Sequence, residues 1–149
     1  MGTANPVPAP AGDVMKFFFN PASIAVIGAS DNPAKPGGRP LVALRQRGYA
    51  GEIYPVNPRH REIGGLKCYP AVTDIPGVVD MAIVAVPAAM VPEAIVGCGE
   101  KGVKAVVVFS SGFAEVGPQG AALQREMLER AREKGIRILG PNCLGLVNL

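Results

Sequence analysis

The sequence predicts an α/β domain in which a parallel sheet carries helices on both faces. Short apolar runs alternate along the chain with segments of helical periodicity. Each apolar run is continuous, as is typical of strands that are buried on both faces. With 149 residues the chain has the length of one ordinary domain. We therefore expect a single Rossmann-like domain with a doubly wound parallel sheet.

The first half of the chain contains two strand signals separated by a helix. Residues 23–28 form a β-branched run that ends in glycine, which predicts a buried strand entering a turn. A helix is expected over residues 40–47, and Gly48 is placed to end it. Residues 52–56 predict the second strand. Glycines and prolines punctuate residues 59–77, where we expect a loop with a short strand or turn.

The second half continues the alternation of strands and helices. Apolar runs predict strands over residues 78–86, 104–109 and 136–139. Helical patterns cover residues 91–101 and 119–134, and each of the two ends before a glycine. The chain then runs on through a second glycine- and proline-containing segment to its last residue.

Composition excludes several classes of partner. Net charge is +3, from 15 Lys and Arg against 12 Asp and Glu, and no basic run occurs, so we expect no nucleic-acid partner. No apolar run approaches the length of about 20 residues that spans a membrane. Mean hydropathy is +0.25, which favours a sheet buried on both faces or a surface that meets a partner.

The cysteines and the N-terminus indicate a reduced, cytoplasmic protein. Three cysteines without CxxC spacing and the single His60 form no metal-binding pattern, so no metal is expected. Cys143 has no histidine to activate it as a nucleophile. Residues 1–15 are small and proline-rich, without the features of a secretory signal. We interpret them as a flexible tail that precedes a domain over residues 16–149.

Ligands of doubly wound sheets bind at the carboxyl ends of the strands, which makes the turn after the first strand a candidate site. There, at Gly28–Ser30, backbone N–H groups and the following helix dipole favour a phosphate. The dinucleotide fingerprint GxGxxG is absent, because Ser30 and Pro33 stand where its second and third glycines belong. This departure disfavours a nicotinamide cofactor.

The end of the second strand carries a further discriminator. NAD-binding domains place an acidic residue there, whereas this chain has Asn57, Pro58 and Arg59. An arginine suits a phosphate on a ribose, which occurs in NADP and in the 3′-phosphate of coenzyme A. The residues alone therefore predict a phosphorylated adenosine and leave the two ligands open.

Five strand-end motifs resemble a known family when they are taken in order. VIGAS, YPVNP, DMAIVAVPA, FSSGF and GPNCLG are similar to the N-terminal CoA-binding domain of NDP-forming (ADP-forming) acyl-CoA synthetases, and in turn to the succinyl-CoA synthetase α subunit. The resemblance covers nearly the whole chain from Phe18 to Asn148. Five motifs in sequence are more specific than one glycine loop.

The resemblance implies coenzyme A as ligand or substrate and assigns its contacts. The turn after the first strand and its loop would hold the phosphates, the second strand end the nucleotide, and the remaining strand ends the adenine or pantetheine path and the thiol. The implied residues are Gly28, Ala29, Ser30, Lys35, Pro36, Gly37, Asn57, Pro58, Arg59, Val86, Pro87, Ser110, Ser111, Gly112, Pro141 and Asn142.

The resemblance also implies what the chain lacks. The family's phosphorylated histidine belongs to the domain after the GPNC motif, and His60 matches no such motif. We therefore expect a chain that is non-catalytic alone, within a parent that forms acyl-CoA, ADP and phosphate from an acid, CoA and ATP. Expected partners are CoA or acyl-CoA and further synthetase domains or subunits, with a homodimer left open. The alternatives are a stand-alone CoA-binding regulatory module and an NADP-binding oxidoreductase domain.

Overall fold

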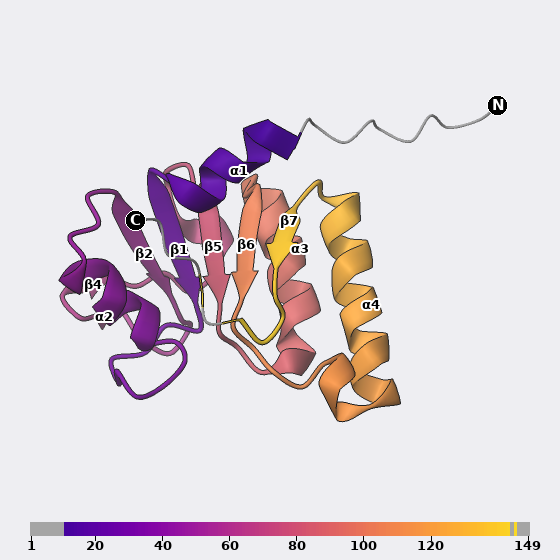
Figure 1. The fold of residues 1–149 in the computed structure, drawn as a ribbon. Helices are drawn as coiled ribbons and strands as arrows, with labels where there is room; N and C mark the ends of the chain where they lie inside the picture. The colour runs from indigo at the N-terminus through magenta and orange to yellow at the C-terminus, as the bar shows by residue number, and fades with distance from the viewer. Residues whose placement is uncertain (1–10, 144, 146–149) are drawn as a thin grey trace.

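The computed structural model of the protein describes residues 11–143 and 145, and a five-stranded sheet lies at its centre (Figure 1). Across the sheet the strands follow the order β2, β1, β5, β6, β7. Their bounds are β1 Ser23–Ile27, β2 Glu52–Val56, β5 Met81–Val84, β6 Ala105–Val108 and β7 Arg137–Leu139. Every neighbouring pair is parallel, which confirms the predicted fold class.

The direction of winding reverses between β1 and β5. From β1 the chain moves outward to β2, whereas from β5 it moves the other way through β6 to β7. The two central strands pair in parallel, with Ile27 opposite Val84 at their carboxyl ends. Ligands of open parallel sheets bind outside the carboxyl ends of the strands at such a reversal. The loops that follow Ile27 and Val84 are therefore the place where the fold predicts a ligand site.

Helices cover both faces of the sheet, as the sequence predicts. In the described part of the chain they are α1 Ala11–Phe19, α2 Arg39–Gln46, α3 Val91–Lys101 and α4 Pro118–Glu133. Side chains of α3 and α4 join one buried cluster, and side chains of α1 and α2 pack in a second cluster on the opposite face. The two clusters make the sheet a buried middle layer.

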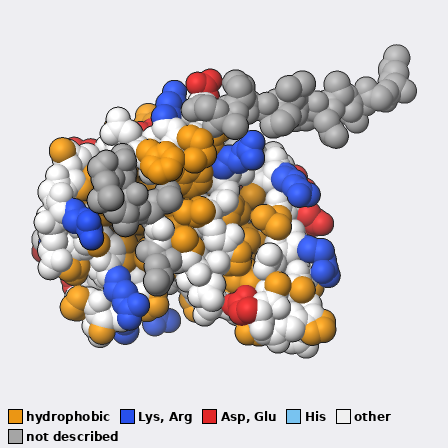
Figure 2. Space-filling view, in the orientation of Figure 1, with side chains coloured by type: hydrophobic (Ala, Val, Ile, Leu, Met, Phe, Trp, Pro, Cys, Tyr) orange, Lys and Arg blue, Asp and Glu red, His pale blue; other side chains and the backbone are white. Residues whose placement is uncertain are grey.

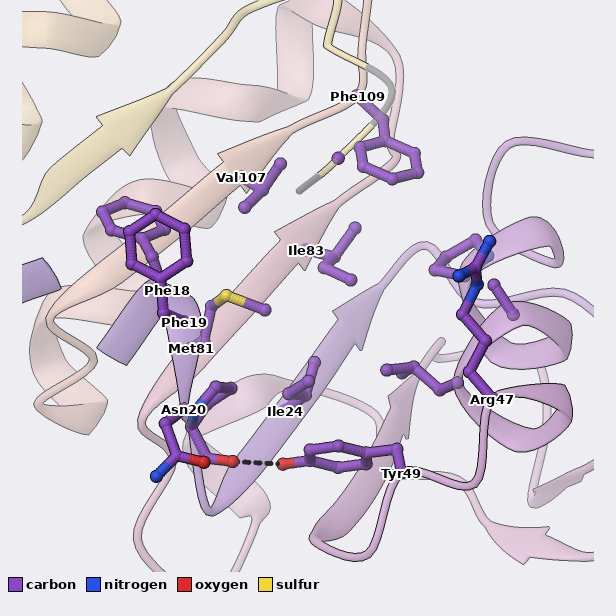
Figure 3. Close-up of a pocket in the computed structure, with 15 residues that line it drawn as sticks. Phe18, Phe19, Asn20, Ile24, Arg47, Tyr49, Met81, Ile83, Val107 and Phe109 are labelled. Carbon is purple, nitrogen blue, oxygen red and sulfur yellow. Dashed lines mark hydrogen bonds between the residues drawn. The ribbon is translucent and has the colours of Figure 1, made fainter. Parts of the chain in front are cut away.

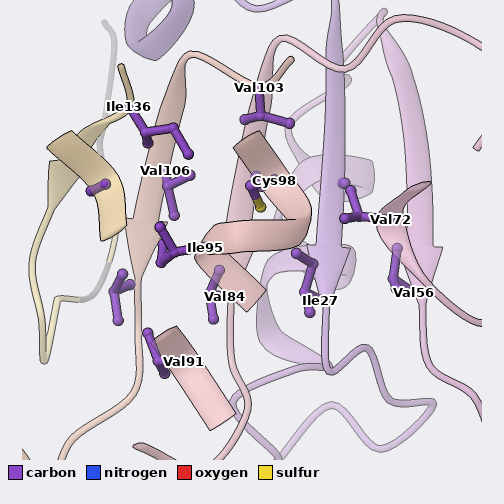
Figure 4. Packing of buried hydrophobic residues seen from close by; sticks show 14 of the residues in the cluster. Ile27, Val56, Val72, Val84, Val91, Ile95, Cys98, Val103, Val106 and Ile136 are labelled. Atoms are coloured by element: carbon purple, nitrogen blue, oxygen red, sulfur yellow. The ribbon is translucent and has the colours of Figure 1, made fainter. Parts of the chain in front are cut away.

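Alternate residues of each strand enter the two clusters, because successive side chains of a strand point to opposite faces. In β1, Ala25 and Ile27 face α3 and α4, while Ile24 and Val26 face α1 and α2. Figure 4 shows Ile95 of α3 among the strand residues of the first cluster, where its side chain is fully buried. Burying an aliphatic side chain of this size contributes about 1.5–3 kcal/mol. Each strand of the sheet therefore has to carry apolar side chains on both of its faces.

The starts of two elements differ from the sequence predictions. Helix α1 begins at Ala11, inside the segment expected to be a flexible tail; residues 1–10 of that segment lie outside the described residues. The strand predicted from residue 78 begins only at Met81, where pairing with β1 and β6 starts; Val78 is 78% exposed and Val79 is buried in the preceding loop. Apolar composition alone does not show where strand pairing starts. Among residues 11–143, no helix is long and apolar enough to cross a membrane.

The loop expected over residues 59–77 contains more structure than a single short strand. It forms an antiparallel hairpin of β3 Glu62–Ile63 and β4 Leu66–Lys67, followed by the 3₁₀ turn η1 Val72–Asp74. Two further 3₁₀ turns, η2 Ala88–Met90 and η3 Ala114–Val116, follow β5 and β6. These turns shape the carboxyl edge of the sheet.

Candidate functional site

The turn after β1 is packed backbone against backbone. Gly28 has φ +84°, and a Cβ added there would lie 2.8 Å from the carbonyl oxygen of Ala85, at the end of β5. Gly37 is buried against the Gly28 carbonyl, so a side chain at Gly37 would collide with it. Ala29 is fully buried as well. Gly28, Ala29 and Gly37 therefore shape the turn by packing.

The amides of this turn already have protein acceptors. Gly28 N–H and Ala29 N–H donate to the Val56 carbonyl at 2.9 and 3.2 Å, and Ser30 N–H donates to the Gly37 carbonyl at 3.3 Å. The Ser30 hydroxyl accepts a hydrogen bond from Asn32 N–H at 3.1 Å. The three amides of Gly28–Ser30 are thus engaged with protein acceptors, and their contact with a phosphate stays a prediction.

Exposed cations lie in the neighbouring loops. Lys35 and Pro36 are exposed between β1 and α2, and Pro58 and Arg59 are exposed after β2. A guanidinium or ammonium group at this edge supplies positive charge that the engaged amides of the β1 turn do not. Lys35 and Arg59 are the predicted residues best suited to meet an anionic ligand directly.

Asn57 fixes the loops after β1 and β2 to one another. Its side-chain amide donates to the Ala29 carbonyl at 2.9 Å, and its Oδ1 accepts from Arg59 N–H at 2.9 Å. The backbone N–H of Asn57 donates to the Tyr69 carbonyl at 2.9 Å. With these bonds in place, Asn57 orients the backbone of Arg59 and the β1 turn, and its contact with the ligand stays a prediction.

The loops after β5 and β6 are joined by a buried serine. Ser110 is 8% exposed, and its hydroxyl donates to the Val86 carbonyl. Ser111 is exposed next to it, as is Pro87 on the facing segment. Gly112 approaches that segment closely, since a Cβ added to it would lie 3.2 Å from the Ala88 side chain. The two serines of the SSG motif thus have different environments, one structural and one open.

The segment after β7 returns to the β6 end. Asn142 N–H donates to the Ser110 carbonyl at 2.9 Å, and Cys143 N–H donates to the Val108 carbonyl at 3.3 Å. Pro141 is half-buried and Asn142 exposed, with Asn142 at φ 53°. The predicted residues of all five strand ends therefore lie along one edge of the sheet, the edge toward which the arrows point in Figure 1.

Two acidic residues that the sequence analysis did not assign to the site hold its loops. Asp31 accepts a hydrogen bond from Gly64 N–H at 2.7 Å, which ties the β1 loop to the β3–β4 hairpin. Glu115 accepts one from Gly112 N–H at 2.6 Å. Glu115 lies three residues after Gly112, and this spacing suits a local hydrogen bond from a backbone amide to a carboxylate. The spacing is the sequence feature from which this bond could have been predicted.

A large cavity lies away from this edge, between α1, α2 and one face of the sheet (Figure 3). Its volume is about 430 Å³, and Phe18, Ile83, Val107 and Phe109 are among its apolar lining residues. Figure 2 shows hydrophobic side chains gathered beside α1 on this face. None of the sixteen predicted site residues lines the cavity, so it is separate from the candidate site.

Two buried cysteines, Cys68 and Cys98, are unsuited to nucleophilic catalysis. Burial raises the pKa of the Cys98 thiol to about 12, and burial also raises the pKa of Cys68. Both thiols are protonated at neutral pH, and protonated thiols are poor nucleophiles. Within residues 11–143 and 145, no cluster of three or more His, Cys, Asp or Glu side chains could hold a metal ion.

The fold and the edge just described define a doubly wound domain, a class whose ligands bind at the carboxyl ends of the strands. The sequence profile of the family described as "CoA binding domain" matches residues 22–148, which includes every strand of the sheet. The chain belongs to this CoA-binding domain family, and coenzyme A is its ligand.

Relatives of known name are larger enzymes. The chain is 52% identical to acetate–CoA ligase [ADP-forming] II of Archaeoglobus fulgidus over 134 residues, which are 90% of this chain and 20% of that protein. It is 46% identical over 135 residues to the α subunit of acetate–CoA ligase [ADP-forming] II of Pyrococcus furiosus, covering 91% of this chain and 29% of the subunit. The chain therefore spans less than a third of the length of these relatives.

A solved structure confirms the fold assignment. The dinucleotide-forming acetyl-coenzyme A synthetase 1 of Ca. Korarchaeum cryptofilum, in complex with phosphate and ADP, superposes with a TM-score of 0.84 at 46% identity. The match covers 88% of this chain and 28% of the synthetase chain. The family resemblance that the five motifs indicated is thus confirmed in sequence and in structure.

Proposed function

We propose that the chain binds coenzyme A along the carboxyl edge of its sheet and presents the thiol to other domains of an ADP-forming acyl-CoA synthetase. The parent reaction would join an acid to CoA while ATP is cleaved to ADP and phosphate. The observation that carries this proposal is the meeting of five strand-end segments at one edge, within the span of the CoA-binding family profile. The names of the enzymatic relatives support the reaction class.

The ligand contacts divide into two groups according to exposure. We assign direct contact to the exposed residues of the edge, which are Lys35, Pro36, Pro58, Arg59, Pro87, Ser111 and Asn142. The buried or hydrogen-bonded members of the predicted set shape the loops from beneath; they include Ala29, Gly37, Asn57 and Ser110. In this arrangement the phosphates lie near the cations at the β1 and β2 ends, and the pantetheine passes the β5 and β6 ends.

The proposed partners follow from the reaction. A chain that holds only the thiol substrate needs further domains or subunits to activate the acid and to bind ATP. The Pyrococcus relative is itself named as a subunit, which supports an assembly of more than one chain. A homodimer remains a further hypothesis, which measurement of the molar mass in solution tests.

Ligand choice is the direct test of the proposed function. Calorimetric titration of the chain should show comparable affinity for CoA and for desulfo-CoA, because adenosine and phosphate contacts dominate the site. NADP should bind much more weakly, since the nicotinamide fingerprint is absent. Tighter binding of NADP than of CoA would overturn the assignment.

Catalysis provides an independent test. The purified chain, supplied with acetate, ATP and CoA, should form no acyl-CoA. Addition of the remaining domains of a homologous ADP-forming synthetase in trans should restore formation of the thioester. Thioester formation by the chain alone would contradict its role as the thiol-holding part.

A further inference from the structure

The loop after β6 is closed on itself by an exposed carboxylate. Glu115 Oε1 accepts a hydrogen bond from Gly112 N–H at 2.6 Å. That bond, followed by bonds from the amides of Glu115 itself and of Phe113, holds the pKa of the Glu115 carboxyl below its ordinary value. The side chain is therefore ionised at neutral pH, and its charge is hydrogen-bonded to the backbone of its own loop. We call this arrangement the Glu115 latch.

The latch acts at a residue whose backbone is unusual. Gly112 has φ +104°, a conformation that residues with a side chain rarely adopt and that glycine leaves only loosely restricted. An added Cβ at Gly112 would lie 3.2 Å from Ala88, so the loop runs close to the η2 segment after Pro87. Restricting Gly112 therefore sets the spacing between the segments that follow β5 and β6.

The rest of the loop is anchored from below. Phe113 is fully buried, and Ala114 N–H donates to Gln124 Oε1 of α4 at 3.2 Å. On the other side, the Ser110 hydroxyl bonds to the Val86 carbonyl. Ser111 and Gly112 lie between these anchors, on the open side of the loop where the Glu115 latch holds the backbone.

We propose that Glu115 is a positioning residue for the pantetheine half of coenzyme A, an inference that rests on the proposed function. It does not touch the ligand, because its carboxylate oxygens face backbone amides of its own loop. Its effect is to hold Ser111 and Gly112 in the arrangement that meets the pantetheine. The adenosine and phosphate end lies at the β1 and β2 loops and does not depend on the Glu115 latch.

A comparison of two ligands, one with and one without pantetheine, distinguishes a positioning role of Glu115 from a general effect on stability. In calorimetric titrations Glu115→Ala should weaken CoA binding roughly tenfold, because Gly112 loses its restraint. The same variant should bind adenosine 3′,5′-diphosphate, which lacks the pantetheine, with unchanged affinity. Glu115→Gln should bind CoA with intermediate affinity, since its amide oxygen still accepts a hydrogen bond but carries no charge.

The matched control is Glu129→Ala, which removes the same charge from an exposed position about three turns along α4. It should bind both ligands as the wild type does. Amide hydrogen exchange gives a second measurement, in which Gly112 and Phe113 should exchange faster in Glu115→Ala than in the control.

The outcomes separate this inference from the proposed function. If Glu115→Ala binds CoA as tightly as the wild type, loses affinity equally for both ligands, or shows unchanged exchange at Gly112, the positioning role is wrong and CoA binding by the domain stands. If the wild-type chain itself does not bind CoA, the proposed function fails and this inference fails with it.

Discussion

The turn after β1 and the loop after β6 lie on the same edge of the sheet but are held by different forces. At the β1 turn, Gly28 and Gly37 bring backbone against backbone, and the amides donate to main-chain carbonyls. At the β6 loop, the side chains of Ser110 and Glu115 make the hydrogen bonds that fix the backbone. Close backbone contact dominates at the first turn, where the Asn57 side chain also donates to the Ala29 carbonyl, whereas side-chain hydrogen bonds dominate at the second.

This difference has a consequence for ligand binding. A turn closed by backbone packing tolerates little change, and it offers few free donors because its amides are already engaged. The exposed side chains of the β6 loop, those of Ser111 and Glu115, can be altered without collapse of the sheet. We therefore expect substitutions at the β1 turn to act mainly on stability and those at the exposed positions of the β6 loop to act mainly on affinity.

The largest effect is expected from Gly28→Ala. The new Cβ would meet the carbonyl of Ala85 at 2.8 Å while the backbone stays at φ +84°, and the two penalties together should cost about 3 kcal/mol in the free energy of unfolding. Gly48→Ala is the control, because Gly48 has φ +68° but open space around it; its cost should be about 1 kcal/mol. Urea denaturation measures both.

Equal losses in the free energy of unfolding at Gly28 and Gly48 would show that the structure near Ala85 adjusts easily to a side chain. The β1 turn would then be no more rigid than the β6 loop. A bulkier Gly28→Val is less informative, because a valine would disturb the central strand β5 as well as any ligand. Loss of CoA binding in that variant would not locate the phosphate.

A smaller effect is expected from Arg59→Ala at the neighbouring β2 end. If engaged amides leave phosphate binding to cations, this variant should lose about 1.5 kcal/mol of CoA binding free energy, roughly tenfold in affinity. The loss should shrink for dephospho-CoA, which lacks the 3′-phosphate. Titration calorimetry of both ligands tests this, with Arg125→Ala on α4 as a control for charge alone. Equal losses for the two ligands would remove the 3′-phosphate from Arg59.

The smallest effects should come from the two serines of the β6 loop. Ser110→Ala removes a buried hydroxyl that donates to the Val86 carbonyl and should lower the free energy of unfolding by about 1 kcal/mol. Ser111→Ala should leave stability unchanged within about 0.5 kcal/mol and weaken CoA binding a few-fold. Thermal denaturation and calorimetry on both variants measure the contrast. A Ser111 variant with reduced stability and intact affinity would reverse the assigned roles.

The sequence by itself determined the central strands, the helices between them and the order of the strand-end motifs. Continuous β-branched runs such as that of β6 favour strands that are buried on both faces. Gly48, Gly102 and Gly135 stop the helices before them because each adopts a positive φ. Helix α3 has the predicted bounds, Val91–Lys101. The five strand-end motifs also identified the family, since local sequence dictates local turn chemistry.

Only the tertiary structure decided which groups at those strand ends are free. Whether the amides of Gly28 and Ala29 can reach a ligand depends on Val56, which is distant in sequence and meets the turn only once β1 and β2 are paired. The same holds for Ser110 and Val86, which lie in the loops after two different strands, β6 and β5. Helix α1 also escaped prediction, because a short helix is stabilised mainly by packing, here of Phe17 and Phe18 against the sheet. Local preferences fix the elements, whereas satisfaction of hydrogen bonds between elements fixes the site.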